Sequence, residues 1–153
     1  MTSLERGQLW VMRIHGAIGS VFLILLTLIP ETVLAKETAL PGGLVVGPVT
    51  LLLILSWLIM PGRRFRAWGY AHEPEELFIR HGVMTQVETV VPLFRVQHID
   101  IGQGPIERAF GVNRLILHTA GTQHSKVELP GLSRATAERL RHAIRLRVAR
   151  EAP

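Results

Sequence analysis

The stretch VQHIDIGQGPIERAFG, Val96–Gly111, contains residue types that could do chemistry. His98 and Asp100 are separated by one residue, a G-x-G follows them, and Glu107 and Arg108 lie near the end of the segment. Side chains two apart on a strand share a face, so His98 and Asp100 could contact a common ligand. This pattern raises three possibilities, namely a metal site, a catalytic constellation and a phosphate-binding loop.

None of the three possibilities is supported by the surrounding residues. A dinucleotide-binding fingerprint needs a third small residue where Glu107 stands, and Pro105 removes one of the N–H donors that a phosphate would need. A metal site needs three or four ligands, and the other histidines lack ligand spacing: His81, His118 and His124. The chain has no cysteine and no nucleophile-elbow pattern. We therefore expect no catalytic residue, metal or cofactor, and a protein that is not an enzyme.

Two long apolar segments dominate the N-terminal part of the chain. LPGGLVVGPVTLLLILSWLIM, residues 40–60, has no charge, and about 20 apolar residues suffice for a helix to cross a bilayer. A second candidate span covers residues 9–29, where a retained helix is favoured over a signal peptide because no cleavage-site pattern closes the run. The short connection predicts an antiparallel transmembrane hairpin over residues 1–62.

The charges around these spans predict an orientation. Arg63, Arg64 and Arg66 follow the second span, whereas the short loop between the spans has no excess of basic residues. By the positive-inside rule both termini are cytoplasmic. Residues 63–153 carry fourteen Lys and Arg against nine Asp and Glu, which accounts for the net charge of +5. We expect the three arginines to contact an anionic membrane surface, and the lack of interleaved aromatic residues argues against nucleic acid.

After residue 63 the pattern becomes that of short alternating strands followed by a helix. Ser133 is a candidate N-cap, and Ala137, Leu140, Ile144 and Val148 form an apolar stripe over a helix at about 133–150. This stripe favours packing on the strands over lying on a membrane surface. The expected strands are residues 64–71, 77–81, 85–91, 94–101, 113–119 and 124–130. Strands at this spacing predict an antiparallel barrel or sandwich, here capped by the C-terminal helix.

If the domain is such a barrel or sandwich, Val96–Gly111 is expected to serve its structure and not catalysis. The glycines permit a strand exit, Pro105 starts a helical turn over residues 106–110, and Phe110 is expected to plug the barrel. Glu107 and Arg108 are expected to pair with charges elsewhere, for instance Arg95 or Asp100. The candidate residues of this polar girdle, which could brace the barrel or meet a partner, are Arg95, His98, Asp100, Glu107 and Arg108.

The same stretch resembles a known family. The pieces VPL-RVQ, QGPIERAFG, LHTAGT and ELPGL are similar to the signature of bacterial pleckstrin-homology-like (PH-like) membrane proteins, in particular their small YdbS-like members. The two transmembrane segments agree with it, so the resemblance covers nearly the whole chain. It implies an α+β membrane protein in which a two-helix transmembrane hairpin precedes a PH-like domain over residues 63–153, in the bacterial inner membrane with the domain in the cytoplasm.

The resemblance brings no catalytic residue with it. It implies a non-catalytic interaction or scaffold module, or an accessory subunit of a membrane complex. The expected partners are the lipid bilayer and a membrane protein, such as a larger relative with several PH-like domains, and a second copy of the chain is a further candidate. The alternative function is an anionic-lipid-sensing or lipid-handling protein of the membrane surface.

Overall fold

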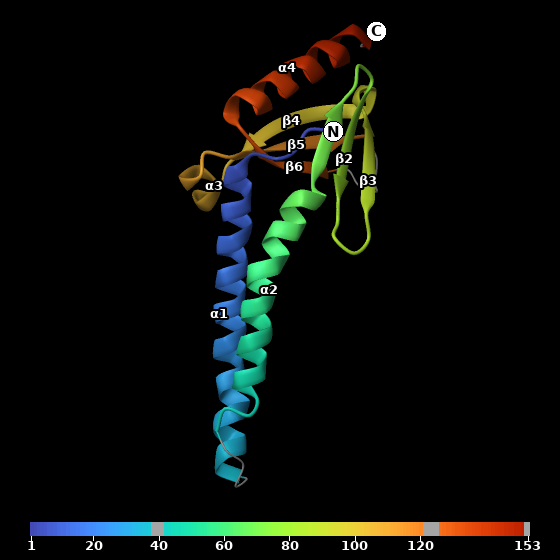
Figure 1. The fold of residues 1–153 in the computed structure, drawn as a ribbon. Helices are drawn as coiled ribbons and strands as arrows, with labels where there is room; N and C mark the ends of the chain where they lie inside the picture. The colour runs from blue at the N-terminus through green and yellow to red at the C-terminus, as the bar shows by residue number, and fades with distance from the viewer. Residues whose placement is uncertain (38–41, 121–125, 152–153) are drawn as a thin grey trace. The chain divides into compact units, whose positions relative to one another are not determined.

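The computed structural model describes residues 1–37, 42–120 and 126–151. The chain forms two compact units. One contains residues 12–62 and the other combines residues 1–11 with residues 63–153. Figure 1 labels the elements in chain order.

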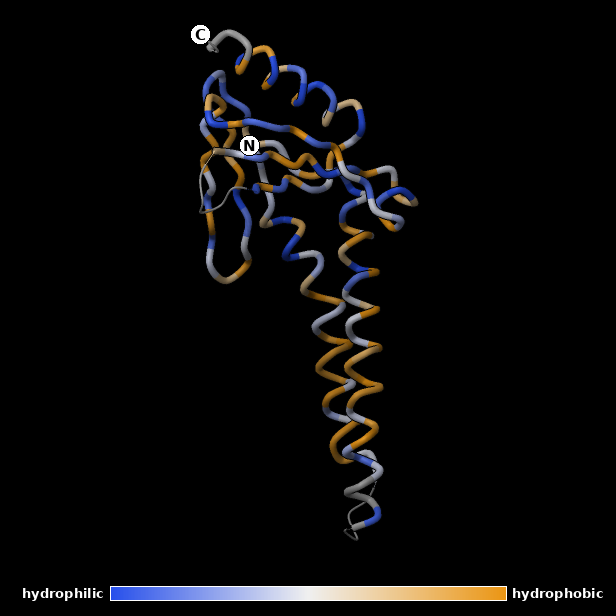
Figure 2. Tube along the Cα trace, turned by 180° about the vertical axis from the view of Figure 1, so that it is seen from behind, coloured by the Kyte–Doolittle hydropathy of each residue, from blue (hydrophilic) through white to orange (hydrophobic). Residues whose placement is uncertain are grey.

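The unit of residues 12–62 is built from two helices, α1 (Arg6–Glu37) and α2 (Val46–Ala67). Both are long and apolar enough to cross a membrane, and hydrophobic residues predominate along both helices in Figure 2. Phe22 and Leu52 are exposed, as expected of side chains that meet lipid. Within this unit the two helices lie side by side, and the indole Nε1 of Trp57 donates a hydrogen bond to the carbonyl of Arg13 at 2.9 Å.

The second helix differs from its prediction at both ends. It begins at Val46 rather than Leu40, after a turn in which Gly43 has a φ of +93°. It also continues through Ala67, so residues 64–67 are helical and not the start of a strand. Arginines favour a helix, and basic side chains in its last turn complement the helix dipole.

Over the described residues, the β domain has two antiparallel sheets of three strands, in the orders β1-β2-β3 and β4-β5-β6. This is the predicted PH-like sandwich, followed by the predicted C-terminal helix. The elements are β1 (Gly69–His72), β2 (Glu76–His81), β3 (Val87–Pro92), the 3-10 helix η1 (Leu93–Arg95), β4 (Val96–Gly102), α3 (Pro105–Ala109), β5 (Asn113–Thr119), β6 (Lys126–Leu132) and α4 (Arg134–Glu151).

The core of the β domain follows the alternation of the strands. Leu77 and Ile79 of β2 and Leu115 and Leu117 of β5 are buried, together with Leu129 of β6. The predicted stripe of α4 packs on η1, β4 and β5, and its buried members are Ala137, Leu140 and Ile144. The predicted N-cap is confirmed, since the backbone N–H of Thr136 donates to Ser133 Oγ at 3.2 Å.

Residues 1–11 belong to the β domain, although the sequence assigned them to the hairpin. Thr2 forms an antiparallel bridge with Tyr70 of β1, and the N–H of Glu5 donates to the carbonyl of Gly131 at 2.8 Å. Leu4 and Val11 are both only 4% exposed. The chain therefore contributes its first residues to the core of a domain whose remaining residues begin about fifty positions later.

Candidate functional site

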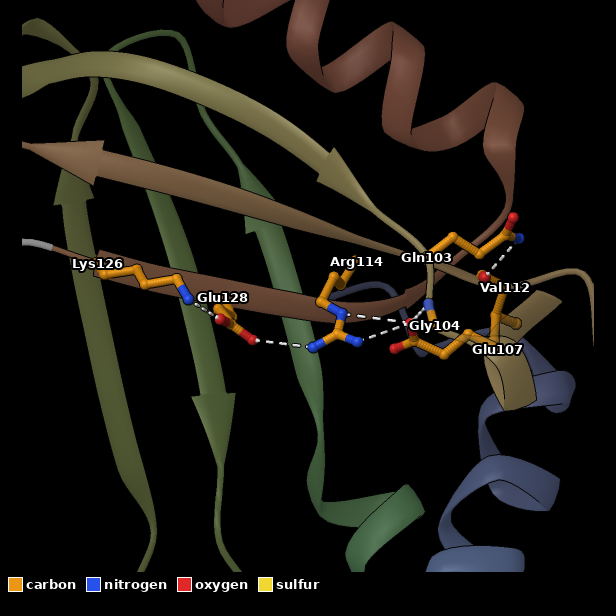
Figure 3. Close-up of polar contacts among 7 residues, drawn as sticks. All are labelled: Gln103, Gly104, Glu107, Val112, Arg114, Lys126 and Glu128. Carbon is orange, nitrogen blue, oxygen red and sulfur yellow. Dashed lines mark hydrogen bonds and ion pairs between the residues drawn. The ribbon is translucent and has the colours of Figure 1, made fainter.

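The residues that first suggested chemistry surround the short helix α3 and strand β5, and Glu107 lies at their centre. Although charged, Glu107 is buried, being 7% exposed. Its Oε2 accepts hydrogen bonds from the N–H of Gly104 at 2.6 Å and from the guanidinium of Arg114 at 3.0 and 3.2 Å (Figure 3). A carboxylate at the third position of a helix that accepts from the N-cap N–H stabilises the first turn. Glu107 thus joins α3 to β5.

Further charged side chains extend the Glu107–Arg114 ion pair across the second sheet. Arg114 Nη1 lies 3.8 Å from Glu128 Oε2, and Lys126 Nζ lies 2.7 Å from Glu128 Oε1 (Figure 3). The hydrogen bond from Lys126, together with the charges of Lys126 and Arg114, lowers the pKa of Glu128. Glu107, Arg114, Glu128 and Lys126 therefore form one chain of alternating charge, which we call the β5–β6 charge ladder. Cross-strand pairs of opposite charge stabilise a sheet.

Glu107 does not pair with Arg95 or Asp100 as the sequence suggested. Its partner Arg114 is seven positions away and is brought near by the tight connection between α3 and β5, where Gln103 Nε2 also donates to the carbonyl of Val112 at 3.0 Å. Arg95 lies in η1, where its guanidinium carbon is 5.7 Å from the centre of the Phe94 ring. The pairing of Glu107 with Arg114 depends on how the chain turns between α3 and β5, which the sequence alone does not show.

His98 and Asp100 are exposed on β4. Asp100 Oδ2 lies 3.3 Å from His118 Nε2, and His98 is directly opposite His118 in the register of β4 and β5. Two histidines and one carboxylate thus gather on the sheet. Nevertheless, no group of three or more His, Cys, Asp or Glu side chains within residues 1–37, 42–120 and 126–151 could hold a metal ion. His124, named above as a weak ligand candidate, lies outside the described residues.

Phe110 does not plug a barrel. It is half-buried and stacks on Trp10, with ring centres 6.3 Å apart and planes 8° from parallel. The core of the β domain is completed instead by Leu4 and Val11 of the N-terminal residues and by Ala137, Leu140 and Ile144 of α4, all of which are buried. Arg108 is exposed on α3.

Arg63, Arg64 and Arg66, the predicted membrane-surface contacts, are exposed in the last two turns of α2. On a helix Arg63 and Arg66 share a face because they are three positions apart, whereas Arg64 points to a different side.

The sequence reasoning overlooked a groove between β4 and α4. Its volume is about 480 Å³. From α4 it is lined by Arg141, Arg145 and Val148, and from β4 by Val96, Gln97, His98 and Ile99. The signal for it was present in the spacing of the two arginines and the valine, since residues four and seven apart on a helix share a face. What could not be read from the sequence is that this face borders β4.

With the fold established, comparison with known proteins identifies the family. The family described as Bacterial PH domain matches residues 14–148. This match covers most of the chain, including both apolar helices and the two sheets.

The chain belongs to the bacterial PH domain family. It is 36% identical over 101 residues to the UPF0699 transmembrane protein YdbS of Bacillus subtilis (strain 168). The alignment covers 65% of this chain and 62% of that relative. No solved structure matches the chain. The resemblance seen in the sequence is thereby confirmed, and the protein is a membrane protein with transmembrane helices and a PH-like domain.

Proposed function

We propose that this bacterial PH domain protein is a membrane-anchored, non-catalytic interaction module that acts as an accessory subunit of a membrane complex. The observation that carries the proposal is the combination of a family PH domain with two apolar helices in one chain. Apolar helices hold a domain at the bilayer, where collision with other membrane proteins is frequent and a binding surface is effectively concentrated.

The state of the polar residues supports a binding role over a catalytic one. Glu107, the most buried charged side chain in the signature stretch, is engaged by Gly104 and Arg114 and so braces the fold. His98 and Asp100, by contrast, are exposed on β4, where a partner can reach them, and within the described residues Asp100 has only the exposed pairing with His118.

The proposed setting is the bacterial inner membrane with the PH domain in the cytoplasm. Arg63, Arg64 and Arg66 support this orientation because basic residues next to a transmembrane helix favour the cytoplasmic side. The proposed partner is a membrane protein, with a larger multi-PH-domain relative as the leading candidate and a second copy of this chain as the next. Nucleic acid and a cofactor have no place in the proposal.

Affinity purification of the tagged full chain from its native membranes in mild detergent tests the proposal. We expect a second membrane protein to elute in a fixed ratio, or two differently tagged copies to elute together. An unrelated two-helix membrane protein with the same tag is the control for background. A homogeneous monomer, recovered after cross-linking in intact membranes as well, would contradict the proposal.

Anionic-lipid sensing is the second candidate function, favoured by the exposure of Arg63, Arg64 and Arg66. Each basic residue near an anionic surface contributes about 1 kcal/mol. On this alternative, hydrogen exchange of residues 63–67 in nanodiscs should slow when phosphatidylglycerol replaces part of the phosphatidylcholine. The triple glutamine variant should lose that difference.

A further inference from the structure

The groove between β4 and α4 meets β4 along its edge. Its lining includes four consecutive residues of the strand, Val96, Gln97, His98 and Ile99. Successive side chains of a strand point to opposite faces of the sheet. A groove that touches four in succession therefore runs along the edge of β4 and not over one face. In Figure 1, α4 runs beside β4, and the groove is lined from α4 by Arg141, Arg145 and Val148.

This edge is open among the strands that the structure describes. The second sheet has the order β4-β5-β6, so β4 pairs with β5 on one side. The register shifts between Val96 and His98, and pairing is then regular from His98 to Gly102. An edge strand presents unpaired N–H and C=O groups, which an added strand can use.

The walls of the groove have a definite charge. Among the side chains that the structure describes, its ionisable lining residues are Arg141, Arg145 and His98, with no carboxylate among them. Arg141 is oriented by an ion pair with Glu138, and Arg145 is exposed. Guanidinium groups bind carboxylates through paired hydrogen bonds. Val96, Ile99 and Val148 form the apolar part of the lining, which we call the groove floor.

We propose that the β4–α4 groove binds an extended, acidic segment of a partner protein. The segment adds to the edge of β4 as a further strand, places alternate apolar side chains on the floor, and directs its carboxylates toward Arg141 and Arg145. This inference rests on the proposed interaction function and specifies the chemistry of the partner. A lipid headgroup would satisfy the arginines but would leave the strand edge unused, so the geometry favours a polypeptide.

The test uses the full chain in a neutral maltoside detergent. The probe is a fluorescein-labelled peptide of alternating valine and glutamate, compared with one of alternating valine and lysine. Fluorescence anisotropy should show binding of the glutamate peptide and not of the lysine peptide. The variant Arg141→Glu/Arg145→Glu should bind the glutamate peptide roughly tenfold or more weakly, because each exposed charge pair contributes modestly.

The matched control is Arg134→Glu/Arg139→Glu. It reverses two exposed arginines of the same helix that do not line the groove and changes the net charge equally. It should bind the glutamate peptide within about twofold of the unmodified chain. Equal losses in both double variants would show a diffuse charge effect and overturn the site.

Hydrogen exchange separates strand addition from other modes of binding. The glutamate peptide should slow exchange of backbone amides in residues 96–102, and binding without such protection would contradict strand addition. Displacement of the peptide by dihexanoyl phosphatidylglycerol, with equal protection of these amides by the lipid alone, would assign the groove to lipid and overturn the proposal.

The two proposals fail in different ways. If the full chain retains its membrane partner while the glutamate peptide does not bind, the groove inference is wrong and the interaction function stands. If the peptide binds but purification from membranes yields only monomer, the interaction function loses its support.

Discussion

At the scale of single residues, the main finding is that Glu107 serves the structure. A buried carboxylate is retained only when hydrogen bonds and an opposite charge compensate its lost hydration. Gly104 and Arg114 supply both. The sequence identified Glu107 as a girdle residue but not its partners, because these depend on how α3 begins at Gly104 and how the following turn places Arg114 beside it.

We predict that Glu107→Ala lowers the free energy of unfolding of the β domain by about 2 kcal/mol. The substitution leaves the N–H of Gly104 and the guanidinium of Arg114 without their acceptor. Native-state hydrogen exchange of the β5 amides in the full chain measures the change.

Glu88→Ala is the matched control for this prediction. Glu88 pairs with Arg80 at 3.5 Å, and both side chains are more than 40% exposed. Its loss should cost no more than about 0.5 kcal/mol. Similar effects of the two substitutions would show that the buried ion pair does not brace α3 against β5.

At the scale of elements, the turn between β2 and β3 depends on one glycine. Gly82 has a φ of +108°, and a Cβ placed there would lie 2.0 Å from the carbonyl oxygen of Thr85. Gly111, which ends α3, also has a positive φ, +65°, but an added Cβ would meet no atom within 4 Å. A substitution at Gly82 would therefore cause both backbone strain and a collision, whereas a substitution at Gly111 would cause backbone strain alone.

We predict that Gly82→Ala destabilises the protein by more than about 2 kcal/mol, whereas Gly111→Ala costs about 1 kcal/mol. The first change must move the turn backbone, while the second only places alanine in the left-handed region. Melting temperatures of the two variants, followed by circular dichroism in detergent, give the comparison. Equal shifts would argue against the collision with Thr85.

The end of α2 shows why the boundaries of a helix or strand are harder to predict from sequence than its existence. Residues 64–71 alternate in polarity as a strand would, yet residues 64–67 are helical. Extending an existing helix requires no new nucleus, and each added residue gains a hydrogen bond. The strand begins only at Gly69, where pairing with Arg80 of β2 becomes available.

At the scale of the whole molecule, the N-terminal residues complete the β domain. Leu4 and Val11 are buried, and Gly7 lies so near the end of α3 that a Cβ would be 2.5 Å from the carbonyl oxygen of Phe110. A fragment that starts at Arg63 would lack these contacts. For this reason the experiments above use the full chain.

We predict that Leu4→Ala destabilises the β domain by about 2–4 kcal/mol, as expected for a buried leucine. Leu146→Ala is its control, because Leu146 of α4 is 51% exposed and its truncation should cost less than about 0.5 kcal/mol. Chemical unfolding of the full chain, followed by tryptophan fluorescence, measures both. An unaltered midpoint for Leu4→Ala would mean that residues 1–11 do not stabilise the domain.

The sequence by itself determined the two apolar helices, the alternating strands, the C-terminal helix with its buried stripe, and the family, because these depend on local periodicity and on a long contiguous signature. Only the tertiary structure decided that Glu107 pairs with Arg114, that Phe110 stacks on Trp10, that residues 1–11 join the β domain, and that Arg141 and Arg145 border the edge of β4. The Glu107–Arg114 pair depends on the tight connection between α3 and β5, and the other contacts join segments distant in the chain. All of them follow from turn geometry, register and packing, which no local pattern encodes.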